Sequence, residues 1–369
     1  MVEHVKEMVC ASSPLLQYKH FDSTVIIGTE FPRGSVQLTS LLTAPNSDDL
    51  IRDLATLVSQ RNVVFFRAQK VNIDQQKELG RRLGELTGKP EESKLHVHPS
   101  TPEVSELGDE ISVISSVERR IGVEAASAQA SKKVFHAEER GGLASDGWHS
   151  DITFEPIPSD YAILKVHTLP ETGGDTLWAS GYEVYDRLSP AYQKFLEGLT
   201  AVHNADFFRH IANVRGNTVR GSLPGEYRGH PLNAGDSLTA SHPVVRTNPV
   251  TGWKSVFVNR GFTRRINELT KDESDRTLQH IFSLITQNHD LQVRFKWEKY
   301  EDEPDAFDVA IWDNRSSYHT ATEDYLTVQG TVRTGDRVVS LGETPEYVEG
   351  SKSRREALGV PKIALKKFY

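Results

Sequence analysis

The chain has 369 residues, of which 43 are Lys or Arg and 51 are Asp or Glu, so its formal net charge at pH 7 is −8. This acidic balance argues against a nucleic acid or an anionic membrane surface as partner, and no apolar run approaches the roughly 18 residues of a membrane span. The single cysteine, Cys10, cannot form an internal disulfide, and Glu3, Lys6 and Glu7 stand where a signal peptide needs an apolar stretch, so we expect a cytoplasmic protein. The length allows two domains, but β-barrels with insertions often run long, and we expect one domain over residues 1–369.

The N-terminal region predicts two helices on either side of one strand. Asn46 to Asp49 can cap a helix whose apolar stripe consists of Leu50, Leu54, Leu57 and Val58. Residues 62–67 have the pattern of a buried strand. Residues 74–86 predict a second helix, with Leu79, Leu83 and Leu86 facing inward.

Two histidines lie in the segment 95–99, where His96 and His98 form a His-x-His pair. Such a pair can bind a metal, but no matched carboxylate lies nearby in the sequence. We therefore expect His96 and His98 to be structural or to support a site, rather than to bind the metal themselves.

The segment 118–147 predicts a long loop. It is poor in aromatic residues, rich in Ala, Ser, Lys, Glu and Gly, and ends next to the run that begins at Trp148. A loop of this length in a compact domain is usually a lid or disordered. We expect a lid over the substrate site, with simple disorder as the alternative.

Two candidate metal ligands lie in the run Trp148-His149-Ser150-Asp151. In an extended segment, residues i and i+2 project to the same side, so both His149 and Asp151 can reach one ion. Trp148 and Phe154 add apolar bulk that suits a pocket wall. A His-x-Asp by itself is more often a surface histidine beside a capping aspartate, so a metal site also needs a third ligand from elsewhere in the chain.

The middle of the chain continues with one strand, one loop and two helices. The motif at Gly173–Trp178 is placed at a distance suited to the next strands of a small barrel, and Gly181–Leu199 predicts a surface helix followed by a turn. Phe207–Asp236 lacks periodicity and predicts a loop. Thr270-Lys271-Asp272-Glu273 matches a capping box ahead of a helix with the stripe Leu278, Ile281, Phe282 and Ile285.

His319 is the third candidate ligand, far downstream, as expected if a neighbouring strand of a barrel carried it. Two imidazoles and one carboxylate on one face of a metal leave the other face open. This facial triad is the geometry of non-haem Fe(II) oxygenases.

Two arginines, Arg333 and Arg337, lie on the segment 332–341, which predicts a strand. They are four residues apart, so on a strand they share a face. The planar fork of arginine binds a carboxylate or sulfonate through two parallel hydrogen bonds. The pair indicates two anionic ligands in a metal-bearing barrel; the alternative is a solvent-exposed basic strand, with Asp336 as a salt-bridge partner.

Four motifs, taken in order, carry a resemblance to a known family. They are Trp148–Phe154, Gly173–Ser180, Trp312–Arg315 ahead of His319, and Arg337–Glu343. Together they resemble the TauD/TfdA (taurine dioxygenase) family of Fe(II)/2-oxoglutarate-dependent dioxygenases, and its fungal branch in particular. The resemblance covers the chain from about Gly80 to Pro345.

The resemblance implies a mainly β protein with helical decorations, of the α+β class, around a double-stranded β-helix (jelly roll) core. It also implies iron held by His149, Asp151 and His319, with 2-oxoglutarate chelating the iron and O₂ as the second co-substrate. The resemblance further implies that Thr176 and Arg333 hold the distal carboxylate of 2-oxoglutarate. No catalytic residue beyond the iron centre is implied.

The primary substrate is expected to be a small anion. The resemblance places Arg337 and His98 near its anionic group. Thr101 stands where the taurine enzyme has a tyrosine, and Ser145 stands at a substrate position where it has an asparagine, so taurine itself is disfavoured. We expect an oxidoreductase that hydroxylates a bulkier sulfonate, releasing sulfite and an aldehyde, or a carboxylate; a homo-oligomer is compatible with this interpretation.

Two other classes of function stay open. The first is a metal hydrolase or lyase on the same barrel that does not use 2-oxoglutarate, since the triad alone does not specify oxygen chemistry. Arg333 and Thr176 have no evident use in such an enzyme. The second is a non-catalytic anion-binding barrel, against which the intact triad argues.

Overall fold

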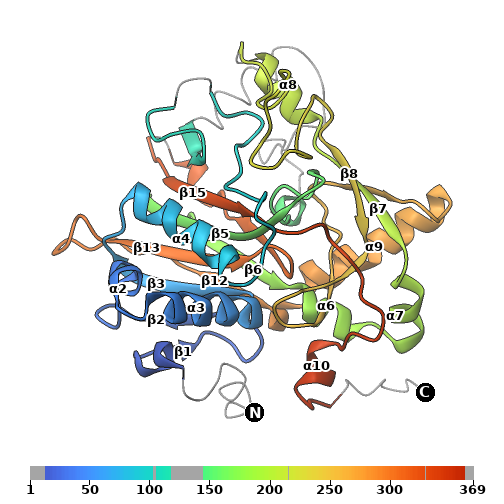
Figure 1. The fold of residues 1–369 in the computed structure, drawn as a ribbon, viewed down its shortest axis with the longest axis horizontal. Coiled ribbons are helices and arrows are strands. Elements are labelled where there is room, and N and C mark those ends of the chain that lie inside the picture. Colours follow the sequence, from blue (N-terminus) through green and yellow to red (C-terminus); the bar gives the residue numbers. More distant parts are fainter. Residues whose placement is uncertain (1–12, 103–104, 118–143, 215, 329, 362–369) are drawn as a thin grey trace.

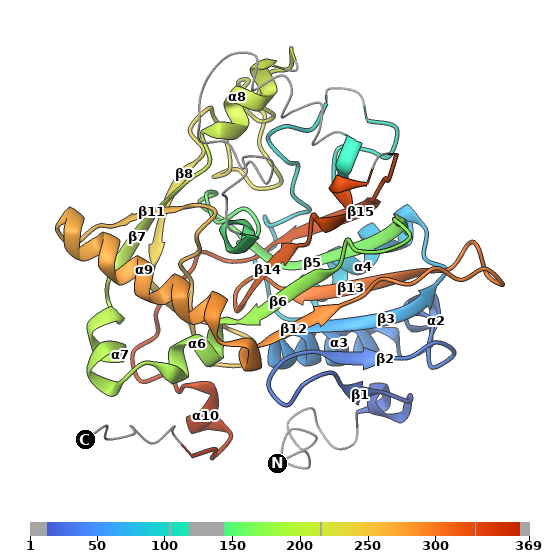
Figure 2. The same cartoon turned by 180° about the vertical axis from the view of Figure 1, so that it is seen from behind.

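The computed structural model describes residues 13–102, 105–117, 144–214, 216–328 and 330–361. A layer of helices, a large sheet and a small sheet are stacked in that order, and a further group of strands and helices lies beside them (Figures 1 and 2). The architecture is α+β, as the sequence predicts.

The large sheet has seven strands in the order β1-β2-β3-β13-β5-β15-β4. Its pairs are antiparallel except β2 with β3, which is parallel. The strand bounds, in sheet order, are Phe21–Asp22, Thr29–Phe31, Val63–Gln69, Phe307–Asp313, Ser159–Thr168, Thr334–Leu341 and Ile111–Ser115.

Three helices cover the outer face of this sheet: α2 (Leu38–Thr43), α3 (Ser47–Arg61) and α4 (Ile73–Glu85) (Figure 1). The apolar stripes predicted for α3 and α4 pack on the strands; Leu54, Val58 and Leu79 share one core cluster with Phe66 and Ile311. The two predicted helices and the strand between them, now β3, are therefore confirmed.

The small sheet covers the other face of the large sheet. It has the order β12-β6-β14, with bounds Gln292–Phe295, Thr176–Ser180 and Ser317–Ala321. Aromatic rings fill the space between the sheets: Phe65 stacks on Phe295 at 4.2 Å, and Trp178 meets Phe65 at 5.3 Å and Trp312 at 5.8 Å between ring centroids. This core fixes β6 and β12 of the small sheet against β3 and β13 of the large sheet.

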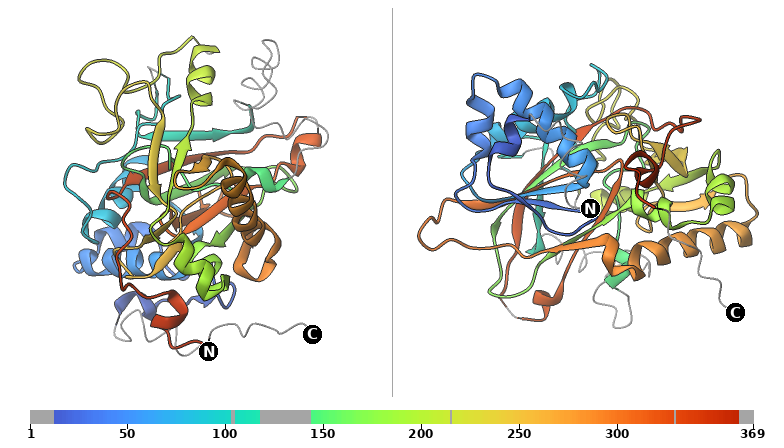
Figure 3. Two further views of the ribbon diagram at one scale, coloured as in Figure 1. Left: turned by 90° about the vertical axis from the view of Figure 1, so that its right-hand side faces the viewer. Right: turned by 90° about the horizontal axis from the view of Figure 1, so that it is seen from below.

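The remaining strands form two smaller sheets beside these layers. One has the order β11-β7-β8 and the other pairs β10 with β9, with bounds Thr263–Ile266, Thr200–Asn204, Thr239–Pro243, Lys254–Val256 and Val245–Thr247. Helix α9 (Lys271–Gln287) starts at the predicted capping box, where Thr270 N–H donates to Glu273 at 3.0 Å. Figure 3 shows α9 on the side of the molecule opposite α2–α4. The short elements are η1 (Pro14–Gln17), η2 (Ala144–Gly147), η3 (His289–Leu291), η4 (Asp324–Thr327) and α10 (Arg354–Ala357).

The single surface helix predicted over Gly181–Leu199 is wrong. Two helices occupy the segment, α6 (Gly181–Arg187) and α7 (Pro190–Leu196). Ser189 accepts a hydrogen bond from the Tyr192 N–H as the N-cap of α7, and Pro190 occupies its first position. Most of α6 is buried rather than on the surface.

The loop predicted over Phe207–Asp236 begins instead with a helix, α8 (Phe207–Val214). Phe207 and Phe208 pack against the central core and Ala212 is fully buried, so tertiary contacts stabilise a helix whose periodicity is too short to recognise in the sequence. The rest of the segment, within the described residues, has no helix or strand.

The lid expected over 118–147 lies mostly outside the described residues, and only its last four residues belong to a described element, η2. Within the part of the chain that the structure describes, no helix combines the length and the apolar character needed to span a membrane.

Candidate metal centre and anion sites

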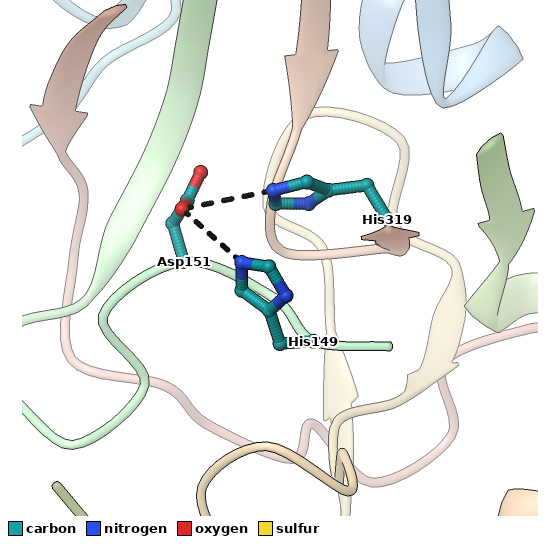
Figure 4. A group of neighbouring side chains, drawn as sticks. All are labelled: His149, Asp151 and His319. Atoms are coloured by element: carbon teal, nitrogen blue, oxygen red, sulfur yellow. Dashed lines mark ion pairs between the residues drawn. The ribbon is translucent and has the colours of Figure 1, made fainter. Parts of the chain in front are cut away.

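The three candidate metal ligands lie together beside β14, the edge strand of the small sheet. His149 comes two residues after η2 and His319 lies in the middle of β14; each donates its backbone N–H to the carbonyl of the other, at 3.0 and 2.7 Å. The ligand atoms of His149, Asp151 and His319 are all within 4.8 Å of one another. Figure 4 shows the three side chains turned toward a common point.

His149 forms a β-bridge with His319 and Asp151 is the first residue of the turn that follows, so both side chains of the His-x-Asp pair reach this point, although no regular strand carries them. Residues 151–154 form a turn in which Glu155 N–H donates to the Ile152 carbonyl at 3.0 Å. Ile152 has φ +48°, a conformation that a β-branched residue adopts only under constraint. Such strain beside a cluster of ligands is typical of functional sites.

Asn314 holds the Asp151 carboxylate in place, a role that no pattern in the sequence indicated. Its Oδ1 accepts the Asp151 backbone N–H at 3.0 Å, and its Nδ2 donates to Asp151 Oδ2 at 3.3 Å. The other oxygen, Oδ1 of Asp151, then faces Nε2 of His149 at 3.9 Å and Nε2 of His319 at 3.8 Å.

The protonation states suit a metal. Nδ1–H of His149 donates to the Gly147 carbonyl at 2.8 Å, which leaves Nε2 as the ligand atom. Burial lowers the pKa of His319 to about 3, so its imidazole is neutral at pH 7. Burial alone would raise the pKa of Asp151, but the charge of Arg337 and then the two imidazoles outweigh it and bring the value to about 2. Two imidazoles and a carboxylate fit Fe(II).

Arg333 and Thr176 form a separate buried site, and Thr176 lies in β6, the strand that pairs with the strand β14 of His319. Arg333 donates from Nε to the Gly174 carbonyl at 2.8 Å and from Nη2 to Thr176 Oγ1 at 3.1 Å. The indole N–H of Trp297 donates to the same Thr176 oxygen at 3.1 Å, and the Arg333 guanidinium lies 5.8 Å from the Trp297 ring. The structure thus brings Arg333 and Thr176 together and adds Trp297, for which the sequence offered no signal.

Arg337 points to the metal cluster instead. Its Nη1 donates to Asp151 Oδ1 at 2.5 Å. β15 spans Thr334–Leu341 and so begins two residues later than the predicted strand, and the register shift between Thr334 and Gly335 lies on its partner strand β5. Arg333 therefore precedes the regular strand, and the two guanidinium groups have different partners.

The two other substrate-site candidates lie in different places. His98 bonds Ser100 through Nδ1 at 2.9 Å, and its ring meets Phe208 edge-on at 4.5 Å. Burial, and then the charges of His96 and Arg337, lowers its pKa well below the usual value, so His98 is neutral. Ser145 is half-buried in η2 and, among the described residues, makes no hydrogen bond to His98 or Arg337.

Aromatic side chains line the surroundings of His149. The Phe262 ring lies 6.0 Å from the His149 ring and 5.1 Å from Phe154, and Phe154 lies 5.6 Å from Phe208. Phe262 and Phe208 were not foreseen, because they come from distant segments that share no motif. Together with Phe154 they give the cluster an apolar border.

A fully buried ion pair, Glu155 with Arg228, anchors the turn that carries Asp151. Arg228 donates from Nε to Glu155 Oε1 at 2.5 Å and from Nη2 to Oε2 at 2.9 Å, and both side chains are 0% exposed. His96 Nε2 also lies 3.1 Å from Glu155 Oε1, which agrees with the structural role expected for His96.

Comparison with known proteins gives consistent matches. The family model described as "Taurine catabolism dioxygenase TauD, TfdA family" matches residues 17–338. The chain is 41% identical to alpha-ketoglutarate-dependent dioxygenase esdpJ of Penicillium shearii, covering 96% of this chain and 97% of the relative. It is 32% identical to an alpha-ketoglutarate-dependent sulfonate dioxygenase of Saccharomyces cerevisiae, covering 79% of this chain and 60% of that protein. The solved structure of a taurine dioxygenase from Burkholderia xenovorans is similar in fold, with a TM-score of 0.63 at 24% identity, over 92% of this chain and 99% of that one.

Proposed function

Because the chain belongs to the TauD, TfdA family, and is thus an alpha-ketoglutarate-dependent dioxygenase that uses Fe(II), 2-oxoglutarate and O₂, we propose that it hydroxylates a small anionic molecule. The observation that carries this proposal is a pair of arginines, one that contacts the metal cluster and one in a separate buried site. Arg333 with Thr176 forms one site for an anion, and Arg337 beside Asp151 forms a second. Two anionic ligands at one centre are what a 2-oxoglutarate enzyme with an acidic substrate needs.

The residues divide into three groups by role. His149, Asp151 and His319 hold the iron, and Thr176 and Arg333 hold the distal carboxylate of 2-oxoglutarate. Arg337 binds the substrate anion, with neutral His98 and, from η2, Ser145 on the substrate side. When bound, iron with 2-oxoglutarate and O₂ supplies the oxidation of a C–H bond to C–OH, with succinate and CO₂ as the other products.

The protein's own residues set the geometry of that reaction. Asn314 fixes the Asp151 carboxylate, Gly147 fixes the His149 tautomer, and Phe262 and Phe154 keep apolar surface beside His149. We also infer that the large and small sheets are the two halves of a double-stranded β-helix, and that residues 1–369 are one dioxygenase domain. The fold similarity to the taurine dioxygenase supports both inferences.

The substrate is proposed to be a sulfonate or a carboxylate larger than taurine. The yeast relative named as a sulfonate dioxygenase supports a sulfonate. Hydroxylation of the carbon next to sulfur would let the C–S bond break, giving an aldehyde and sulfite. The aromatic border formed by Phe154, Phe208 and Phe262 favours an apolar body on the substrate.

The first prediction tests the metal centre. His149→Ala, Asp151→Ala and His319→Ala should each remove the visible charge-transfer band that Fe(II) and 2-oxoglutarate give without O₂, and should abolish succinate formation, while the near-UV circular dichroism stays native. Each substitution deletes one of three ligands, and no other His, Cys, Asp or Glu joins this cluster among the described residues. An exposed histidine, His289→Ala, is the control and should keep the band.

The same assay identifies the substrate class. Sulfonates, sulfate esters, carboxylates and neutral analogues of equal size are compared for substrate-dependent succinate release. An anionic compound should give the largest stimulation. A wild-type protein without the band, or one stimulated only by neutral compounds, would contradict the enzyme assignment or the anion assignment respectively.

A further inference from the structure

Arg337 touches the metal cluster at a defined atom. Its Nη1 donates to Oδ1 of Asp151, which is the oxygen that faces Nε2 of both His149 and His319. The Arg337 side chain is 12% exposed and that of Asp151 is 3% exposed, so the contact is shielded from water. The positive charge of Arg337 therefore acts directly on Oδ1 of Asp151, the oxygen that would bind the metal.

The guanidinium of Arg337 has a second edge that is not used by Asp151. Nε–H and Nη2–H point the same way and can bind one oxyanion through two parallel hydrogen bonds. Nε of Arg337 is buried and, among the described residues, has no hydrogen-bond partner. A buried donor without a partner is costly, so this edge is built to receive an acceptor.

We propose that Arg337 couples the binding of the metal to the binding of the primary substrate. Its Nη1 holds Asp151, while its Nε–Nη2 edge binds the oxyanion of the substrate. This inference rests on the proposed function and adds to it. An unneutralised guanidinium beside Asp151 repels a dication at the cluster. An oxyanion on the far edge cancels that charge, so the anion strengthens metal binding, and by thermodynamic linkage the metal strengthens anion binding by the same factor.

Binding measurements with simple ions test the coupling without 2-oxoglutarate or the natural substrate. Co²⁺ is titrated calorimetrically into the metal-free protein in sodium sulfate and in sodium chloride of equal ionic strength. Sulfate should lower the Kd for Co²⁺ by about tenfold, within the usual range of coupling between two sites. Co²⁺ should lower the Kd for sulfate by the same factor.

Three variants locate the effect. Arg337→Gln should abolish the difference between sulfate and chloride. Arg337→Lys keeps the charge but lacks the second edge, so most of the difference should be lost there too. Arg276→Gln removes an arginine whose side chain is 80% exposed on α9, and should behave like the wild type.

The following results would refute the coupling. It is refuted if sulfate and chloride give the same Co²⁺ affinity in the wild type, or if the difference survives in Arg337→Gln. Loss of the difference in Arg333→Gln but not in Arg337→Gln would place the sulfate at Arg333 instead. The proposed function fails separately, through an absent charge-transfer band, because this titration contains neither iron nor 2-oxoglutarate.

Discussion

Single residues define the anion site around Arg333. Gly174 has φ +75°, and a Cβ built on it would lie 2.9 Å from Arg333 Cδ and 3.3 Å from Pro170 Cγ. Its carbonyl also accepts the Arg333 Nε–H. A glycine is needed here for two reasons, the left-handed backbone and the close approach of the guanidinium stem.

The second prediction concerns this contact. Gly174→Ala should weaken 2-oxoglutarate binding by at least about tenfold, because a shift of Arg333 disturbs charged hydrogen bonds of about 1.5–3 kcal/mol. The measurement is a titration of 2-oxoglutarate monitored by the charge-transfer band without O₂.

Gly252→Ala is the matched control. Gly252 has a similar backbone, φ +70°, but a Cβ there would meet no atom within 4 Å. Both variants carry the backbone strain, and only Gly174→Ala should change the affinity for 2-oxoglutarate. Equal affinities in the two variants would show that the Gly174 contact does not position Arg333.

At the scale of elements, the turn after Asp151 is held by segments far away in the sequence. Arg228 donates to Glu155 through two nitrogens and also to the carbonyls of Arg220 and Gly235. His242 bonds the Glu155 carbonyl at 3.0 Å. The segment after α8 is thus joined to the turn that carries a metal ligand.

The third prediction concerns this ion pair. Arg228→Met should lower the free energy of unfolding by about 3–5 kcal/mol, because it leaves a buried carboxylate without its counter-charge. Arg209→Met, which breaks the exposed pair with Asp206 on neighbouring α8, should cost less than about 1 kcal/mol. Chemical denaturation measures both; similar losses would mean that the burial of the Glu155 pair does not matter.

At the scale of the whole molecule, buried titratable groups make stability depend on pH. Burial lowers the pKa of His242 to about 4 and that of His203 well below its usual value. The unfolded chain protonates these histidines near pH 6.5 while the folded chain does not, so stability falls as the pH drops from about 6.5 toward 4. Burial raises the pKa of Asp160 to about 6, which has the opposite effect between about pH 4 and 6, because the folded state holds a proton that the unfolded state has released.

The fourth prediction isolates one of these groups. In the metal-free protein, His242→Gln should reduce the loss of stability between pH 7 and pH 4 by about 3 kcal/mol, since glutamine keeps a donor for the Glu155 carbonyl but cannot be protonated. The measurement is urea denaturation at several pH values. The exposed His289→Gln is the control, and parallel pH profiles for wild type and His242→Gln would contradict the assignment.

The sequence alone determined the features that depend on near neighbours. The stripes of α3 and α4, the capping box of α9 and the strand β3 were predictable, because apolar periodicity and end caps involve residues within about four positions. The motifs also pointed to His149, Asp151 and His319, which the structure gathers within reach of one ion.

Only the tertiary structure decided how those side chains are held and which arginine meets which partner. The turn at Ile152 and the amide of Asn314, 163 residues away from Asp151, place the carboxylate, while Arg333 meets Thr176 and Arg337 meets Asp151. Trp297 reaches Thr176 across 121 residues of sequence. Such partners result from the pairing and stacking of sheets, and the energy of each pairing depends on surfaces that no local pattern encodes.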